Sequence, residues 1–154
     1  MSGLTHFDGD GRARMVDVSG KVASERVAIA RGFVAVPEKV LARIEASGKG
    51  EPIAVAELAG IMGAKRTGEL IPLCHPLGLD AVSVSISPGD GGLTVEAEVR
   101  TTGRTGVEME AMTAVSIACL TLYDMLKAAA RGITIERIEL VEKRGGKSGT
   151  WRRE

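Results

Sequence analysis

Two stretches of alternating apolar and polar residues, joined by a glycine-rich turn, are the feature of this sequence that most restricts its fold. Residues 81–87 read AVSVSIS, residues 93–101 read LTVEAEVRT, and the turn PGDGG between them spans residues 88–92. Alternation with a period of two sends successive side chains to opposite faces of a sheet. The pattern therefore predicts an antiparallel hairpin with one apolar face and one polar face.

The residues before this hairpin predict a strand followed by helices. Residues 26–36, RVAIARGFVAV, are apolar and rich in β-branched side chains, as in a strand. Pro37 ends this strand and begins a short helix that we expect to run through Ala46. Apolar residues recur at roughly helical spacing in residues 53–67, which predicts a helix despite two internal glycines.

The residues after the hairpin predict one long helix and a final strand. Residues 107–131 are rich in Ala, Met, Leu and Ile, and Gly132 is expected to close the helix at its C-terminus. Residues 133–142, ITIERIELVE, are expected to form the last strand. The order βαββαβ predicts an α+β, ferredoxin-like fold with a four-stranded antiparallel sheet and two main helices on one face. Such a fold does not by itself indicate a function.

The chain is expected to form a single domain over residues 1–154. Residues 1–20 are rich in Gly and Asp and are expected to form an N-terminal arm, whereas residues 143–154 are expected to form a flexible basic tail. A flexible link is expected near residues 47–51, SGKGE.

The composition argues against nucleic-acid and membrane partners. Lys and Arg number 20, as do Asp and Glu, so the chain has no net charge that would attract a polyanion. Aromatic residues make up 3%, which leaves few rings for stacking bases. Apolar stretches are interrupted well before about 18 residues, and the start of the chain lacks the pattern of a signal peptide. We therefore expect a cytoplasmic protein.

One candidate site is the loop LIPLCHP at residues 70–76, in which Cys74 and His75 lie between two prolines. The prolines restrict the loop, so His75 is held in place. The His75 ring can hydrogen-bond to a ligand oxygen, or His75 can be a structural histidine whose ring bonds to the backbone. The sequence alone favours the structural role. Adjacent Cys and His cannot easily chelate one ion, and only His6 and Cys119 remain, so no metal site is expected.

A second candidate site is the start of the long predicted helix, where Glu108, Met109 and Glu110 fall in the first turn. Acidic residues at this position complement the helix dipole, and methionine packs, without any ligand. A carboxylate beside free backbone N–H groups can equally accept hydrogen bonds from a guanine edge. The two roles are compatible.

The third candidate site, Asp124 and Lys127, lies near the other end of the same helix. Residues three apart are neighbours on a helix surface, so the pair can be an ordinary exposed ion pair. Apolar residues flank Asp124 in the sequence, however. A carboxylate in an apolar environment beside an ammonium group can have a shifted pKa and act as an acid or base.

Basic residues form the remaining candidates: Lys49 and Lys65 beside the helix of residues 53–67, and the C-terminal EKRGGKSGTWRR. The GGKSG stretch is not a P-loop, because that pattern requires glycine where Val141 stands. The glycine-rich segment with Lys143 and Lys147 can still fold over phosphates, or it can be a solvated terminus.

Five long motifs, in order along the whole chain, resemble the cyclic pyranopterin monophosphate synthase family, also called molybdenum cofactor biosynthesis protein C. They are LTHFDGDGRARMVDVSGK, AGIMGAKRTGELIPLCHPL, TGRTGVEMEAMTA, LTLYDMLKAA and EKRGGKSGTW. The resemblance implies a lyase that converts 3′,8-cyclo-7,8-dihydro-GTP to cyclic pyranopterin monophosphate and pyrophosphate. No cofactor is expected, although Mg²⁺ can accompany the triphosphate.

The resemblance also implies roles for residues at matching positions. Asp124 and Lys127 correspond to the family's catalytic pair, which suits the proton transfers of ring opening and closure. The substrate-binding residues are expected to be Leu73, Cys74, His75, Met109 and Glu110, with Arg26, Lys49, Lys65 and Lys143 as further pocket residues. Positive charge among these suits a leaving pyrophosphate.

The family resemblance further implies a homohexamer built as a trimer of dimers. Fourteen residues separate Glu110 from Asp124, or roughly 21 Å along a helix. One compact substrate cannot span this distance within a chain, so we expect the active site to lie at a dimer interface. Two other functions stay possible besides an enzyme. One is a non-catalytic nucleotide-binding regulatory module of ferredoxin-like fold, and the other is a structural subunit of a larger complex.

Overall fold

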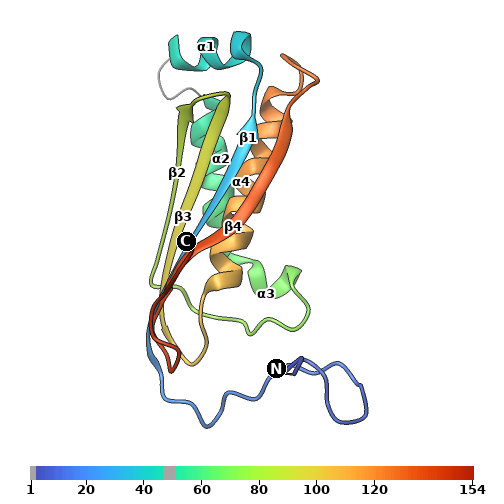
Figure 1. The fold of residues 1–154 in the computed structure, drawn as a ribbon, viewed down its shortest axis with the longest axis vertical. Helices are drawn as coiled ribbons and strands as arrows, with labels where there is room; N and C mark the ends of the chain where they lie inside the picture. Colours follow the sequence, from blue (N-terminus) through green and yellow to red (C-terminus); the bar gives the residue numbers. More distant parts are fainter. Residues whose placement is uncertain (1–2, 47–50) are drawn as a thin grey trace.

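A computed structural model of the protein describes residues 3–46 and 51–154. The described residues form one antiparallel sheet, two long helices and two short ones (Figure 1). In chain order the elements are β1 (Ser24–Ala35), α1 (Glu38–Ala46), α2 (Glu51–Lys65), α3 (Thr67–Leu70), β2 (Ala81–Gly89), β3 (Gly92–Gly103), α4 (Glu108–Leu126), β4 (Thr134–Arg144) and β5 (Trp151–Arg152).

The sheet confirms the predicted ferredoxin-like arrangement. Its strand order is β2-β3-β1-β4-β5, and all neighbouring strands are antiparallel. Strands β1 and β3 lie side by side in the centre, with β2 next to β3 and β4 next to β1, as the ferredoxin-like topology requires. Helices α2 and α4 pack on each other and lie together on one face of the sheet (Figure 1).

Strand β5 is an addition that the sequence pattern did not predict, and it gives the sheet five strands rather than four. It pairs with the end of β4, where Lys143 lies opposite Trp151. Lys143 therefore belongs to a strand. The segment 143–154 returns on itself through Gly145, Gly146 and Gly149, which all have positive φ. Only glycine adopts this conformation without strain. The flexibility expected of this segment stays a prediction.

The core lies between the sheet and the two long helices. The apolar face of β3, with Leu93, Val95, Ala97 and Val99, is fully buried, as the alternation predicted. The glycines in α2 allow close packing against α4. A Cβ atom added at Gly63 would lie 2.8 Å from Ile117 Cγ1, which is too close for a side chain. The glycines therefore lower the helix propensity of α2 but allow it to pack closely against α4.

Two boundaries differ from the sequence prediction. Helix α4 ends at Leu126 rather than near Arg131, because the backbone N–H groups of both Ala129 and Ala130 donate to the Leu126 carbonyl and tighten the last turn. Gly132 does not adopt the positive φ of a capping glycine. The hairpin turn is also shorter than predicted, since β2 continues to Gly89 and β3 starts at Gly92.

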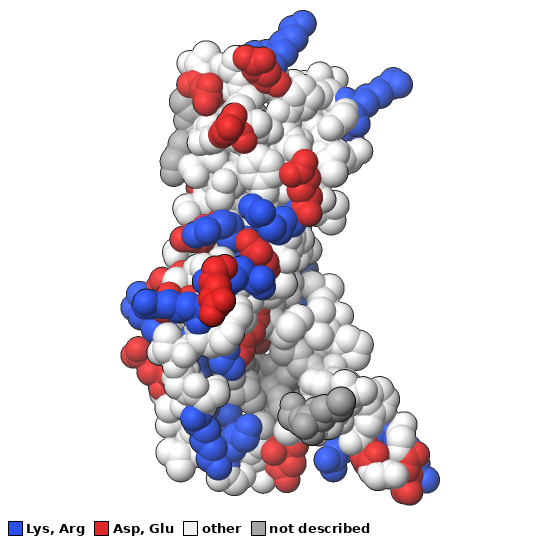
Figure 2. Space-filling model, viewed as in Figure 1, with Lys and Arg blue, Asp and Glu red and all other residues white. Residues whose placement is uncertain are grey.

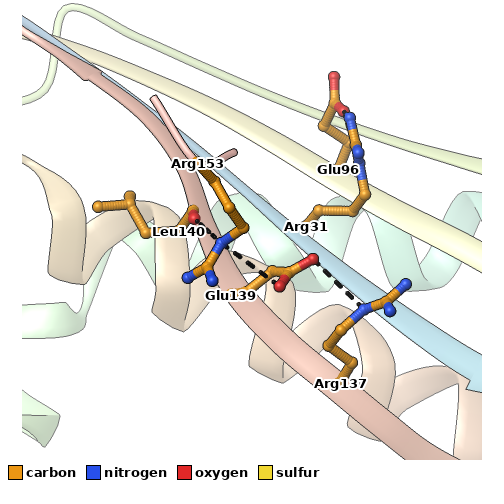
Figure 3. Close-up of polar contacts among 6 residues, drawn as sticks. All are labelled: Arg31, Glu96, Arg137, Glu139, Leu140 and Arg153. Carbon is orange, nitrogen blue, oxygen red and sulfur yellow. Dashed lines mark hydrogen bonds and ion pairs between the residues drawn. The ribbon is translucent and has the colours of Figure 1, made fainter. Parts of the chain in front are cut away.

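The face of the sheet opposite the helices is polar, as expected. Figure 2 shows positive and negative side chains mixed across it. Arg31 on β1 pairs with Glu96 on β3 at 2.8 Å. Glu139 on β4 forms ion pairs with Arg137 at 3.3 Å and with Arg153 at 3.4 Å (Figure 3). These pairs are partly exposed, so each contributes little to stability.

Candidate functional site

Helix α4 carries candidate residues at both of its ends. Its first turn contains Glu108, Met109 and Glu110, as the sequence predicted. Met109 is 41% exposed, whereas Glu110 is only 3% exposed. The loop that follows α3 packs against this end of the helix, at the lower end of the domain in Figure 1.

Glu110 contacts Cys74 of that loop. The Cys74 Sγ atom lies 3.7 Å from Glu110 Oε1 and donates a weak hydrogen bond to it. The other carboxylate oxygen, Oε2, is buried and has no hydrogen-bond partner among the described residues. Burial raises the pKa of Glu110. Burial, assisted by the Glu110 charge, raises the pKa of the Cys74 thiol to about 11. A buried oxygen without a partner makes Glu110 a strong candidate for binding a donor from a ligand.

His75 is held by the segment that precedes β1. Its Nε2 atom lies 2.6 Å from the Val16 carbonyl oxygen. A carbonyl can only accept, so Nε2 carries the proton and Nδ1 of the neutral ring is the acceptor nitrogen. The backbone therefore satisfies one ring nitrogen, as in the structural role considered above. Asp17 lies nearby, where hydrogen bonds from Ser19, with a smaller effect of His75, lower its pKa.

A basic pocket of about 690 Å³ opens where β1 begins, β3 leads into α4 and β4 ends. No acidic residue lines it among the residues that the structure describes. Its five basic lining residues are Lys21, Arg26, Arg104, Lys143 and Lys147. Arg26 and Lys143 were predicted as pocket residues, whereas Lys21 and Arg104 were not. Both stand in loops, and the strand order alone brings these loops together.

Arg26 is a half-buried residue in the lining of this basic pocket. Its Nη2 atom donates to the Arg104 carbonyl at 3.4 Å, and its buried Nε has no partner among the described residues. The GGKSG loop lies directly on the guanidinium group. A Cβ atom on Gly146 would overlap with Arg26 Nη1. Thus GGKSG is not a P-loop, but it does fold over a group suited to phosphate.

Lys143 and Glu108 connect the basic pocket to the start of α4. Lys143 Nζ lies 2.5 Å from Glu108 Oε1, and each side chain is about 30% exposed, at 31% and 27%. The Glu108 carboxylate in turn raises the pKa values of Glu110 and Cys74 slightly, as the weakest of their causes. The pocket and the Cys74–Glu110 pair are therefore neighbours.

Asp124 and Lys127 form an ion pair at the far end of α4. Asp124 Oδ1 lies 2.7 Å from Lys127 Nζ, and the hydrogen bond raises the pKa of Lys127. Both side chains are more than half exposed. Within its own chain Asp124 thus lacks the apolar environment that its sequence neighbours suggested. Leu120 and Tyr123 beside it expose apolar surface to solvent.

The remaining candidates lie elsewhere. Lys65 lines a separate hollow between the end of α2 and the start of β2. Lys49 lies outside the described residues. Leu73 is half-buried, beside Cys74. Across residues 3–46 and 51–154, no group of three or more His, Cys, Asp or Glu side chains is arranged to hold a metal ion.

The structure thus brings most predicted site residues together at one end of the domain and leaves the predicted catalytic pair at the other. The predicted binding residues at this end are Leu73, Cys74, His75, Met109, Glu110, Arg26 and Lys143. Asp124 and Lys127 stand apart from it, about 21 Å along α4 from Glu110.

Comparisons with known proteins agree with the motifs. The model of the MoaC family matches residues 15–146. A protein of Thermomicrobium roseum is 59% identical over 158 residues, covering 100% of this chain and 95% of the relative. A protein of Novosphingobium aromaticivorans is 56% identical, covering 99% and 98%. A protein of Cereibacter sphaeroides is 57% identical, covering 97% and 96%. All three are named cyclic pyranopterin monophosphate synthase.

Proposed function

The chain belongs to the MoaC family, and we propose that the clusters at the two ends of α4 together form the active site through which it acts. Its function is that of a cyclic pyranopterin monophosphate synthase in molybdenum cofactor biosynthesis. It is therefore an enzyme with a small-molecule substrate.

The proposed reaction is the conversion of 3′,8-cyclo-7,8-dihydro-GTP to cyclic pyranopterin monophosphate with release of pyrophosphate, which makes the enzyme a lyase acting on a phosphorus–oxygen bond. The basic pocket carries this proposal. Five basic residues converge there in a chain without net charge. Such a concentration of positive charge suits the triphosphate of the substrate and the leaving pyrophosphate.

Asp124 and Lys127 are proposed as the catalytic acid and base. The ammonium group of Lys127, 2.7 Å from Asp124 Oδ1, is proposed to donate a proton to a ring nitrogen or oxygen. Asp124 can accept one. The Cys74–Glu110 pair is proposed to hold the guanine-derived ring, because Glu110 Oε2 is a buried acceptor without a partner among the described residues.

The active site is proposed to lie between two subunits. Asp124 is exposed within its own chain, and Glu110 lies too far along the same helix to share one substrate with it. Exposed Leu120 and Tyr123 provide apolar surface for a neighbouring subunit beside Asp124. The assembly is proposed to be the homohexamer, a trimer of dimers, that the family resemblance implies.

We further propose that the enzyme works in the cytoplasm, without cofactor, nucleic acid or membrane, and that Mg²⁺ enters only with the triphosphate. Helix α4 is long and apolar enough to cross a membrane, but 44% of the relevant window is buried in the domain. A core helix of a globular fold passes the same test. Loss of turnover in EDTA, restored by Mg²⁺, would assign the ion a role.

The deciding experiment is turnover by the purified protein. Incubation with the cyclised GTP derivative is expected to release pyrophosphate and form the pterin, and Asp124→Asn is expected to stop both. Binding of this compound without turnover would instead indicate a regulatory module. Turnover that requires a second protein would indicate a subunit of a larger complex.

A further inference from the structure

The ion pair between Glu108 and Lys143 has a feature that simple stabilisation does not explain. Lys143 lines the basic pocket, yet its ammonium group already contacts a carboxylate from outside the lining. The distance is 2.5 Å and both side chains are partly buried, so this ion pair is more enclosed than the pair of Asp124 and Lys127. One of the five positive charges of the pocket is therefore paired with a carboxylate of the same chain.

The local backbone allows this contact. Glu108 is the first residue of α4, and its side chain folds back over Gly106. A Cβ atom at Gly106 would overlap with Glu108 Oε2. Gly106 itself lines the pocket. The carboxylate thus lies at the edge of the space where a phosphate would bind. It fits there because Gly106 has no side chain.

We propose that Glu108 is an internal competitor of phosphate for Lys143. The inference rests on the proposed function, because it assumes that the basic pocket binds the substrate triphosphate. When phosphate binds, Lys143 shifts its hydrogen bonds from Glu108 to a phosphate oxygen. When pyrophosphate leaves, Glu108 takes the ammonium group back. No covalent bond is formed or broken in either step.

Competition of this kind weakens the binding of polyphosphate, and it assists release of the product. A pocket with five uncompensated cations would retain pyrophosphate tightly, and slow release would limit turnover. A carboxylate that replaces phosphate on one cation lowers the cost of dissociation. A residue that only positioned Lys143 would have the opposite effect, because its removal would weaken polyphosphate binding.

The test is the dissociation constant of inorganic pyrophosphate, measured by titration calorimetry on the full-length protein. Glu108→Gln keeps the size of the side chain and removes its charge. We expect it to bind pyrophosphate about fivefold more tightly than the wild type and to show stronger inhibition by pyrophosphate. The control is Glu139→Gln, which changes the net charge by the same amount on the face of the sheet opposite the helices. It is expected to leave pyrophosphate binding unchanged.

Two outcomes overturn the inference, and they are distinguishable. If Arg26→Ala and Lys143→Ala leave pyrophosphate binding unchanged, the pocket is not the phosphate site, and the proposed use of the pocket fails with the inference. If both variants weaken binding but Glu108→Gln binds pyrophosphate equally or more weakly, the inference alone is wrong. In Lys143→Ala, the further change Glu108→Gln should have a smaller effect, because the contested cation is missing.

Discussion

The Sγ atom of Cys74 lies 3.7 Å from Oε1 of Glu110, so a thiol and a carboxylate share a poorly solvated space at the start of α4. Both groups have raised pKa values, and burial is the main cause for each. The Glu110 charge makes ionisation of the thiol less favourable, whereas the hydrogen bond from the thiol partly offsets the effect of burial on the pKa of Glu110. Two predictions follow from this contact.

Cys74 should react slowly with iodoacetamide near neutral pH. With a pKa of about 11, only about one thiol in a thousand is ionised at about pH 8. The alkylation rate should keep rising with pH towards that value. Glu110→Gln removes a negative neighbour and lowers the Cys74 pKa, so alkylation at a fixed pH should be faster. Mass spectrometry of the labelled peptide measures the rate, and buried Cys119 is the internal control. A rate that levels off near neutral pH would contradict this account.

Glu110→Gln should stabilise the fold while impairing activity. Because burial raises the Glu110 pKa, the folded chain holds this proton more tightly than the unfolded chain does. The stability that results is fully present below the usual glutamate pKa of about 4.3, and it is lost as pH rises through the folded pKa. The variant should therefore gain about 1 kcal/mol or more in free energy of unfolding at about pH 8, and less at about pH 4.

Denaturant unfolding at both pH values measures this difference. Glu69→Gln, which changes an exposed carboxylate on α3, is the matched control and should show no pH-dependent gain. A stability difference between Glu110→Gln and the wild type that does not vary with pH would show that Glu110 titrates normally in the folded chain.

Asp124→Asn and Lys127→Ala should abolish turnover and leave the fold intact. The two side chains are 67% and 60% exposed, so their loss should leave the free energy of unfolding nearly unchanged. Loss of a general acid or base should reduce the rate by at least about a hundredfold. The control is Arg100→Ala, which breaks an exposed pair of 2.6 Å with Glu98 on β3. Near-normal turnover in either catalytic variant would reject the assignment.

Binding of GTP, as a substrate analogue, should weaken steeply as salt increases. The pocket is open to solvent and lined by basic groups, whose attraction for a triphosphate is screened by ions. Arg26→Ala and Lys143→Ala should weaken binding and flatten its salt dependence. Arg43→Ala removes the same charge from exposed α1, at the other end of the domain, and should do neither. A GTP affinity that does not change with salt would count against the basic pocket as the triphosphate site.

Most of the fold was predictable because each element carries a local signal. The alternation in residues 81–87 and 93–101 specifies faces and pairing, and Pro37 marks a boundary. The end of α4 was predicted too far along, because the alanines after Lys127 favour a helix, whereas the tightened last turn depends on backbone hydrogen bonds. Strand β5 was missed because two residues carry no pattern. It exists through pairing with β4.

The site was predictable only where a motif carried it. Cys74 and Glu110 stand 36 residues apart, and no pattern within either segment indicates that they touch. Arg104 and Lys21 lie within motifs of the family resemblance but were not predicted as pocket residues, because only the strand order places their loops beside Arg26. For Asp124, the exposed position is one of the two alternatives that the sequence left open. Apolar neighbours along a helix point in different directions, so they do not surround a side chain.

The last prediction concerns the sharing of active sites between subunits. Glu110 and Asp124 are both on α4 and roughly 21 Å apart along its axis. If two such helices pack antiparallel across a twofold axis, Glu110 of one chain approaches Asp124 of the other, and two equivalent sites result. Glu110→Ala and Asp124→Asn, each inactive alone, should then regain activity when dissociated together and reassembled. At random mixing, about half of the dimers contain both variants, and each of these has one intact site. Pyrophosphate release measures the recovery, and reassembly of each variant alone is the control. An inactive mixture in which mass spectrometry detects mixed oligomers would show that each chain holds a complete site.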